Sequence, residues 1–177
     1  AVFFKCLYSK SPEVIEAANI GLSGVISATN KLPKDVLQSG LRPILVNLQD
    51  PRKLSVENLD GLARLLKLLT NYFKVEIGTR LLDHLKSIAD QNSLQKISFT
   101  MIEQNPKMKI VTGIFNIFHL LPAAAATFLK QIIEKVIELE TALRRTHYSP
   151  FREPLIKYLC MYPKEAWEYF APNLKDQ

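Results

Sequence analysis

The chain has 177 residues, of which 47% are hydrophobic and only six are glycine, and its formal net charge is +6. This hydrophobic content argues against a disordered chain, and the scarcity of glycine disfavours a β-sandwich or barrel with its many turns. The mild positive charge permits an acidic partner without requiring one. Because no long basic run is present, direct nucleic-acid binding is not expected.

The first predicted helix begins at Ser11-Pro12-Glu13, where a capping serine, a proline at the first helical position and an acidic residue follow one another. Its apolar pattern continues to about Ser27. Pro33 opens a second helix, which Gly40 and Pro43 are expected to interrupt before the apolar run resumes.

The stretch from Leu54 to Leu85 carries the strongest amphipathic pattern of the chain. Apolar residues recur there at steps of three and four, which places them on one face of a helix that begins after a capping Ser55. The pattern breaks near residues 71–75 and then restarts, which predicts an antiparallel helical hairpin. We expect Leu66, in the middle of the apolar face, to be buried.

Two more strong helical patterns follow a weak stretch near residues 90–106. Lys107–Leu121 predicts one helix, and Ala123–Leu143 predicts a single long one. Ser149-Pro150 repeats the helix start seen earlier, and Pro163 opens a final helix. We assign the aromatic residues of this last helix to the core, with a docking surface as the alternative: Trp167, Tyr169 and Phe170.

These segments together predict an all-α protein, a HEAT-like α-solenoid of antiparallel helix pairs. Pro12 and Val56 are 44 residues apart, as are Pro33 and Ile77, and HEAT and armadillo repeats have a period of about 40–47 residues. We expect residues 1–177 to form one helical-repeat segment, a fragment of a much larger chain. Its approximate helix pairs are 12–48, 55–89, 107–145 and 150–172.

No pattern in the sequence predicts a catalytic, cofactor-binding or metal site. Gly21–Gly24 lies inside a helical pattern and lacks the lysine and the preceding strand of a phosphate-binding loop. The sequence has no His-x-x-x-His or Cys-x-x-Cys pair to hold zinc. We interpret His84 as a surface residue and Cys160 as a small core residue. The chain is therefore expected not to be an enzyme and to need no cofactor.

The cellular compartment is constrained by what the sequence lacks. Two cysteines are too few for a disulfide framework, which favours a reducing compartment. No signal peptide is visible, and no apolar run reaches the length of a membrane span, so no membrane association is expected.

Three stretches resemble a known family: Gly40–Leu85, Ile114–Leu143 and Ser149–Phe170. Within them the strings FHLLP and SPFREPLIKYL are the most specific. The stretches are similar to the TRRAP family, which includes its yeast counterpart and consists of PIKK-family pseudokinases. These proteins are scaffolds of SAGA and NuA-type histone acetyltransferase complexes. The resemblance implies a HEAT-repeat segment, and no part of it matches a kinase signature.

From the resemblance we expect a nuclear, non-catalytic scaffold segment of a transcription coactivator subunit, which links activators to histone acetyltransferase complexes on chromatin. The expected partners are the other subunits of those complexes and activators with acidic activation segments. A HEAT-repeat adaptor that carries cargo, as in transport, is the alternative. A nucleic-acid-binding helical repeat is a weaker third option, which the salt dependence of binding would separate from the others.

Basic residues in the predicted connectors are the candidate partner-binding residues: Arg52, Lys53, Arg144 and Arg145. Connectors line the edges of a solenoid, where these charges could flank an apolar groove and attract an acidic segment. Simple solubility of the surface is the competing interpretation, because charges at the rim of an interface mostly alter the association rate.

Overall fold

A computed structural model describes residues 2–29, 32–90, 94, 97, 102–144 and 148–174. Within these ranges most residues are helical and none lies in a strand, which confirms the all-α prediction. The chain divides into two compact units, Ala1–Tyr72 and Phe73–Gln177. This boundary falls inside the predicted pair 55–89. The predicted helix pairs and the single segment over residues 1–177 stay predictions.

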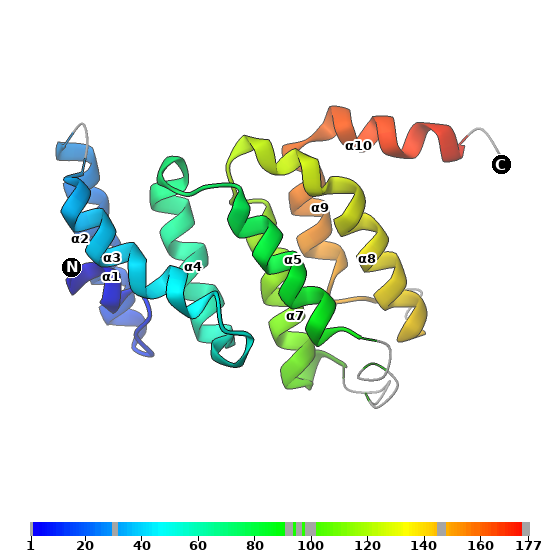
Figure 1. Cartoon of the computed structure of the whole chain (residues 1–177), viewed down its shortest axis with the longest axis horizontal. Coiled ribbons are helices and arrows are strands. Elements are labelled where there is room, and N and C mark those ends of the chain that lie inside the picture. The colour runs from blue at the N-terminus through cyan, green and yellow to red at the C-terminus, as the bar shows by residue number, and fades with distance from the viewer. Residues whose placement is uncertain are drawn as a thin grey trace. The chain divides into compact units, whose positions relative to one another are not determined.

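Unit 1 consists of α-helices and short 3-10 turns (Figure 1): α1 (Val2–Cys6), α2 (Pro12–Ala28), α3 (Lys34–Asn47), η1 (Pro51–Lys53), α4 (Val56–Leu69) and η2 (Thr70–Tyr72). The predicted N-caps are present. The Ser11 hydroxyl accepts a hydrogen bond from the Val14 amide at 3.4 Å, and the Ser55 hydroxyl accepts one from the Asn58 amide at 3.2 Å. These bonds satisfy amides that the first turn of a helix leaves without a partner.

The short helix α1 packs closely on its neighbours because three aromatic rings, those of Phe3, Phe4 and Tyr8, lie directly on the glycine backbones of Gly21, Gly40 and Gly61. A Cβ atom added to Gly40 of α3 would lie 2.5 Å from Cδ2 of Phe4. One added to Gly61 of α4 would lie 2.2 Å from Cδ1 of Tyr8, which follows α1. Ordinary side chains at either glycine would keep α1 at a greater distance.

The predicted interruption at Gly40 and Pro43 is wrong, because α3 continues through both residues. Pro43 has no amide hydrogen for the carbonyl of Ser39, but both residues are exposed, so water can reach that carbonyl. Gly40 is unfavourable in an isolated helix, but here it is buried beneath the ring of Phe4. A tertiary contact therefore outweighs the local preference.

Helix α4 supplies much of the core of unit 1. Five of its leucines are at most 2% exposed: Leu59, Leu62, Leu65, Leu66 and Leu69. Leu66 is fully buried, as predicted. Their spacing extends beyond one narrow stripe, so α4 presents apolar residues over a wide part of its circumference.

Unit 2 contains α5 (Glu76–Ile88), η3 (Ile102–Gln104), α7 (Pro106–Phe118), η4 (Ala123–Phe128), α8 (Leu129–Ala142), α9 (Arg152–Met161), α10 (Pro163–Phe170) and η5 (Ala171–Leu174). In Figure 1, α10 crosses the ends of α8 and α9 and contacts both helices. Lys135 joins α8 to the end of α5, since its ammonium group donates to the carbonyl of Ala89 at 3.2 Å. The bond satisfies a carbonyl at a helix end.

The two specific strings of the sequence meet in an aromatic cluster at the centre of unit 2. Phe118, from FHLLP, packs edge-to-face against Tyr158, from SPFREPLIKYL, with ring centroids 5.9 Å apart. Phe115 and Phe151 make a second such contact at 5.7 Å. Edge-to-face pairs stabilise a core beyond their buried area, so both strings contribute residues to the packing of unit 2.

The prediction of a single helix over Ala123–Leu143 is wrong at its start, where η4 is a 3-10 helix. The amide of Leu129 donates to Ala126 instead of Ala125, and the carbonyl of Ala125 accepts the hydroxyl of Tyr158. A side chain from α9 therefore takes the acceptor that an α-helix would use, and the backbone winds more tightly.

Three assignments of burial from the sequence are also wrong. Trp167 is 65% exposed and no residue of α10 is buried, so its aromatic residues do not form a core. His84 is buried on α5, and Cys160 is exposed on α9. Each error arises because the side of a helix that faces its neighbours depends on the packing of the whole unit.

Candidate interaction surface

Arg52 and Lys53 lie in η1, a single turn capped by Asp50. The Asp50 carboxylate accepts the Arg52 amide at 3.1 Å and forms an ion pair with the Arg52 guanidinium, Oδ1 to Nε, also at 3.1 Å. The hydrogen bond from that guanidinium lowers the pKa of the Asp50 carboxyl, which therefore stays ionised at neutral pH. Because the Arg52 side chain is 89% exposed, this pair contributes little to stability.

The ion pair makes Arg52 and Lys53 unequal in their ability to attract an anionic partner. Asp50 forms an ion pair with Arg52, whereas Lys53 interacts with the Asp50 charge without forming an ion pair in the described part of the chain. The Lys53 carbonyl accepts a hydrogen bond from the Asn58 side chain at 2.7 Å, which fixes η1 to the first turn of α4. Lys53 is therefore the stronger candidate for attracting an anionic partner.

Arg144 belongs to unit 2, where it is exposed in the turn after α8 with a positive φ of 52°. This backbone conformation is common just after a helix C-terminus, where a cation also suits the helix dipole. Arg145, the fourth candidate, lies outside the described residues. The candidates therefore divide between the units, with Arg52 and Lys53 in unit 1.

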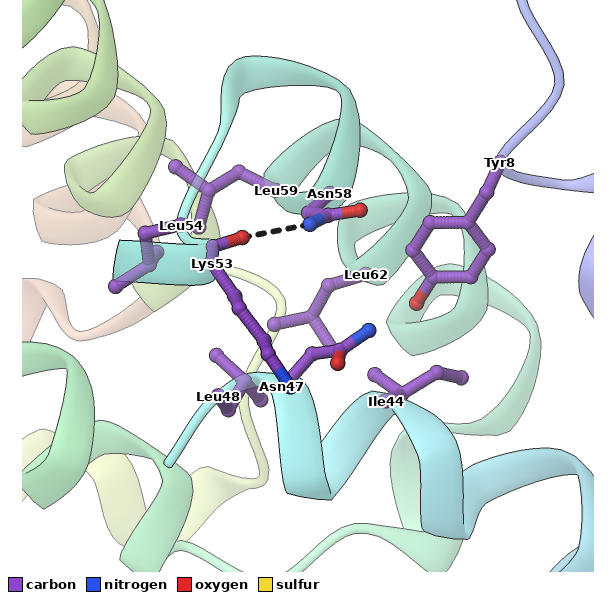
Figure 2. A pocket seen from close by; sticks show the side chains of 9 residues that line it. All are labelled: Tyr8, Ile44, Asn47, Leu48, Lys53, Leu54, Asn58, Leu59 and Leu62. Atoms are coloured by element: carbon purple, nitrogen blue, oxygen red, sulfur yellow. Dashed lines mark hydrogen bonds between the residues drawn. The ribbon is translucent and has the colours of Figure 1, made fainter. Parts of the chain in front are cut away.

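A groove that the sequence did not predict lies in unit 1, next to a recess that Lys53 lines. We call it the α1–α3 groove, and it has a volume of about 270 Å³ between Phe4, Lys5, Tyr8, Ser39, Pro43 and Ile44. It continues into a smaller recess of about 20 Å³, between Tyr8, Asn47, Lys53, Asn58 and Leu62. Figure 2 shows the recess, in which the Lys53 side chain extends from η1 toward Asn47.

Tyr8 forms the common wall of the groove and the recess. Its hydroxyl group is buried and has no hydrogen-bond partner within the described residues. Burial raises the pKa of this hydroxyl, against the opposing effect of the Arg64 charge, so the group stays protonated. Arg64 itself donates to the Leu7 carbonyl at 2.8 Å, which anchors the chain just before Tyr8.

The described side chains offer no candidate metal site. No cluster of three or more His, Cys, Asp or Glu residues is placed there to hold a metal ion. Within the same residues, every helix is too short or too polar to cross a membrane. What these units do offer is exposed cations and grooves between helices.

Comparison with known proteins places the chain in a family. A model of the Tra1 HEAT repeat ring region matches residues 1–177. The chain belongs to the Tra1 family. The resemblance to the TRRAP family and the expected HEAT-type solenoid segment are thereby confirmed. The matched region of this Tra1-family chain is the repeat ring and not a kinase domain.

Relatives in yeasts and in animals agree with this assignment. The chain is 44% identical over 99% of its length to a Schizosaccharomyces pombe protein named SAGA complex/NuA4 acetyltransferase complex subunit Tra1. It is 45% identical over 98% of its length to the Saccharomyces cerevisiae protein of the same name. The human transformation/transcription domain-associated protein is 30% identical over 96% of the chain. This Tra1-family chain spans about 5% of the length of each of these relatives.

Proposed function

We propose that this chain is a non-catalytic scaffold segment of a transcription coactivator subunit that links activators to histone acetyltransferase complexes. The observation that carries the proposal is the match of the whole chain to the Tra1 HEAT repeat ring region. The names of the two yeast relatives, which describe subunits of the SAGA and NuA4 acetyltransferase complexes, support it. Helical repeats provide extended surfaces for such assembly.

The proposed partners are the other subunits of these complexes and activators with acidic activation segments, and the proposed location is the nucleus. Disordered acidic segments order only on binding, so their capture benefits from long-range attraction before any contact forms. The mild excess of basic residues in the chain, a net charge of +6, is consistent with such attraction.

Within this function, Arg52 and Lys53 are proposed to steer an acidic segment toward unit 1. Both are exposed and lie on one turn, and Lys53 also borders the recess shown in Figure 2. Exposed charges act over roughly 8–10 Å at physiological salt, so their effect should fall on the association rate more than on the dissociation rate. The Asp50–Arg52 ion pair makes Lys53 the larger contributor.

The test is a double charge reversal, Arg52→Glu with Lys53→Glu, in the 177-residue chain. Association with a fluorescent acidic activation segment is followed by stopped flow at low and at physiological salt. We expect the association rate at low salt to fall by about tenfold and its salt dependence to become weaker. Far-UV circular dichroism checks that the helices are intact.

The matched control is Lys74→Glu with Arg80→Glu, which changes the net charge equally at two exposed positions of unit 2. If both double variants lower the rate to the same extent, only net charge matters. If neither changes the rate or its salt dependence, Arg52 and Lys53 are ordinary surface residues.

A further inference from the structure

The α1–α3 groove combines an apolar floor with a basic border. Phe4 and Ile44 form the floor and are at most 8% exposed, while Lys5, Ser39 and Pro43 are exposed along the sides. Lys53 lies at the adjoining recess. Neither the groove nor the recess is lined by any Asp or Glu of the described chain. The charge that borders the groove is therefore positive.

The groove has room for a bulky apolar side chain. Its volume of about 270 Å³ lies below the range of about 300–1,000 Å³ that is typical of pockets for whole small molecules. A single leucine or phenylalanine side chain fits in it. The recess, at about 20 Å³, is too small for more than a water molecule.

The walls of the groove are held in place before any partner arrives. Phe4 lies directly on Gly40, and Tyr8 lies directly on Gly61, so α1 has little freedom to move toward α3 or α4. The hydrogen bond from Arg64 to the Leu7 carbonyl fixes the end of α1. A preformed groove requires little ordering of the protein on binding, which favours recognition of a short flexible segment.

We propose that the α1–α3 groove is the docking site for one bulky apolar side chain of an acidic peptide segment, with Lys5 and Lys53 facing the carboxylates that flank this side chain. The proposal rests on the proposed function, because it names the place where a steered acidic segment is held. Apolar burial supplies the affinity, and the two lysines select acidic over neutral or basic segments.

The probe is a fluorescein-labelled peptide of about 15 residues in which Asp and Glu alternate with Leu and Phe, a composition that is disordered when free. Its affinity is measured by fluorescence anisotropy. Two matched peptides are compared, one with every Leu and Phe replaced by Ala, and one with the acids replaced by Asn and Gln. We expect each replacement to weaken binding by at least about tenfold, because both apolar burial and charge are required.

The protein variant is Ser39→Trp, which fills the groove from an exposed position of α3. Its control is Gln38→Trp, the exposed neighbour that does not line the groove. We expect Ser39→Trp to weaken binding by about tenfold or more and Gln38→Trp to change it less than about twofold. Lys5→Glu, which leaves the floor intact, should weaken binding and reduce its salt dependence. This variant keeps the test valid if Ser39→Trp does not fold.

Two outcomes would overturn the proposal. In the first, Ser39→Trp folds and binds the probe as the unaltered chain does. In the second, the alanine peptide or a DNA duplex of similar charge binds as tightly as the probe, which would show a purely electrostatic surface. If Ser39→Trp has no effect while the Arg52 and Lys53 reversal still lowers the association rate, the groove assignment fails and the steering function stands.

Discussion

Because Tyr8 lies so close to Gly61, we predict that Gly61→Ala lowers the stability of the fold, whereas helix propensity alone would predict a gain. Replacing glycine by alanine inside an exposed helix stabilises it by about 1 kcal/mol. At Gly61, however, the new Cβ would lie 2.2–2.7 Å from three atoms of the Tyr8 ring. Ordinary contact is 3.4–4 Å, so the ring must retreat by about 1 Å or more. Overpacking of this kind costs about 1–3 kcal/mol, which outweighs the gain.

We therefore expect Gly61→Ala to destabilise unit 1 by about 1 kcal/mol. The matched control is Gly24→Ala on α2, where a Cβ would meet nothing within 4 Å and where stabilisation by about 1 kcal/mol is expected. Urea unfolding followed by far-UV circular dichroism gives both values, and hydrogen exchange of the α4 amides assigns the change to unit 1. The reasoning is refuted if Gly61→Ala stabilises the chain as much as Gly24→Ala does.

Three further predictions concern single side chains. Leu66→Ala should lower the free energy of unfolding by about 2–5 kcal/mol in urea titrations, and a loss below about 0.5 kcal/mol would contradict its place in the core. Tyr8→Phe should raise the free energy of unfolding by about 1 kcal/mol, because the hydroxyl is buried without a hydrogen-bond partner within the described residues. A lower free energy of unfolding would show that the hydroxyl is bonded. Burial raises the pKa of the Glu140 carboxyl, but the hydrogen bonds from Arg152 and Ser149 outweigh it and hold this pKa below 4.5. The ion pair with Arg152 therefore stabilises the fold above pH 4.5, and this stabilisation is lost as the pH falls through the pKa of Glu140 in the folded chain. The stability difference between the unaltered chain and Glu140→Gln should therefore shrink at acidic pH, as measured by thermal unfolding at several pH values. A difference that stays constant with pH would contradict this assignment.

The features that the sequence predicted correctly are those that short-range interactions determine. Ser11 and Ser55 cap helices because a hydroxyl needs only an amide three residues away. The burial of Leu66 follows from a periodic apolar pattern that extends over several helical turns. The family could also be predicted, because FHLLP and SPFREPLIKYL can each be recognised as one unbroken run of residues.

The features that the sequence did not predict depend on contacts between distant residues. Helix α3 continues through Gly40 because Phe4 covers it, and no pattern within α3 reveals that partner. The α1–α3 groove likewise requires α1 to be placed on α3, although Lys53 at the adjoining recess was identified from a connector. The exposure of Trp167 follows from the way α10 crosses the ends of α8 and α9 (Figure 1), which helical periodicity does not specify.

The bond between the Tyr158 hydroxyl and the Ala125 carbonyl has a consequence for the order in which unit 2 folds. Ala-rich residues 123–128 have a strong local tendency to continue α8 as one α-helix. The tighter 3-10 winding becomes favourable only after α9 has docked and brought Tyr158 to that carbonyl. We therefore expect residues 123–128 to favour α-helical winding until α9 docks, and to adopt the 3-10 form once the Tyr158 hydroxyl bonds to the Ala125 carbonyl. On this expectation the native form of η4 depends on a residue 33 positions further along the chain.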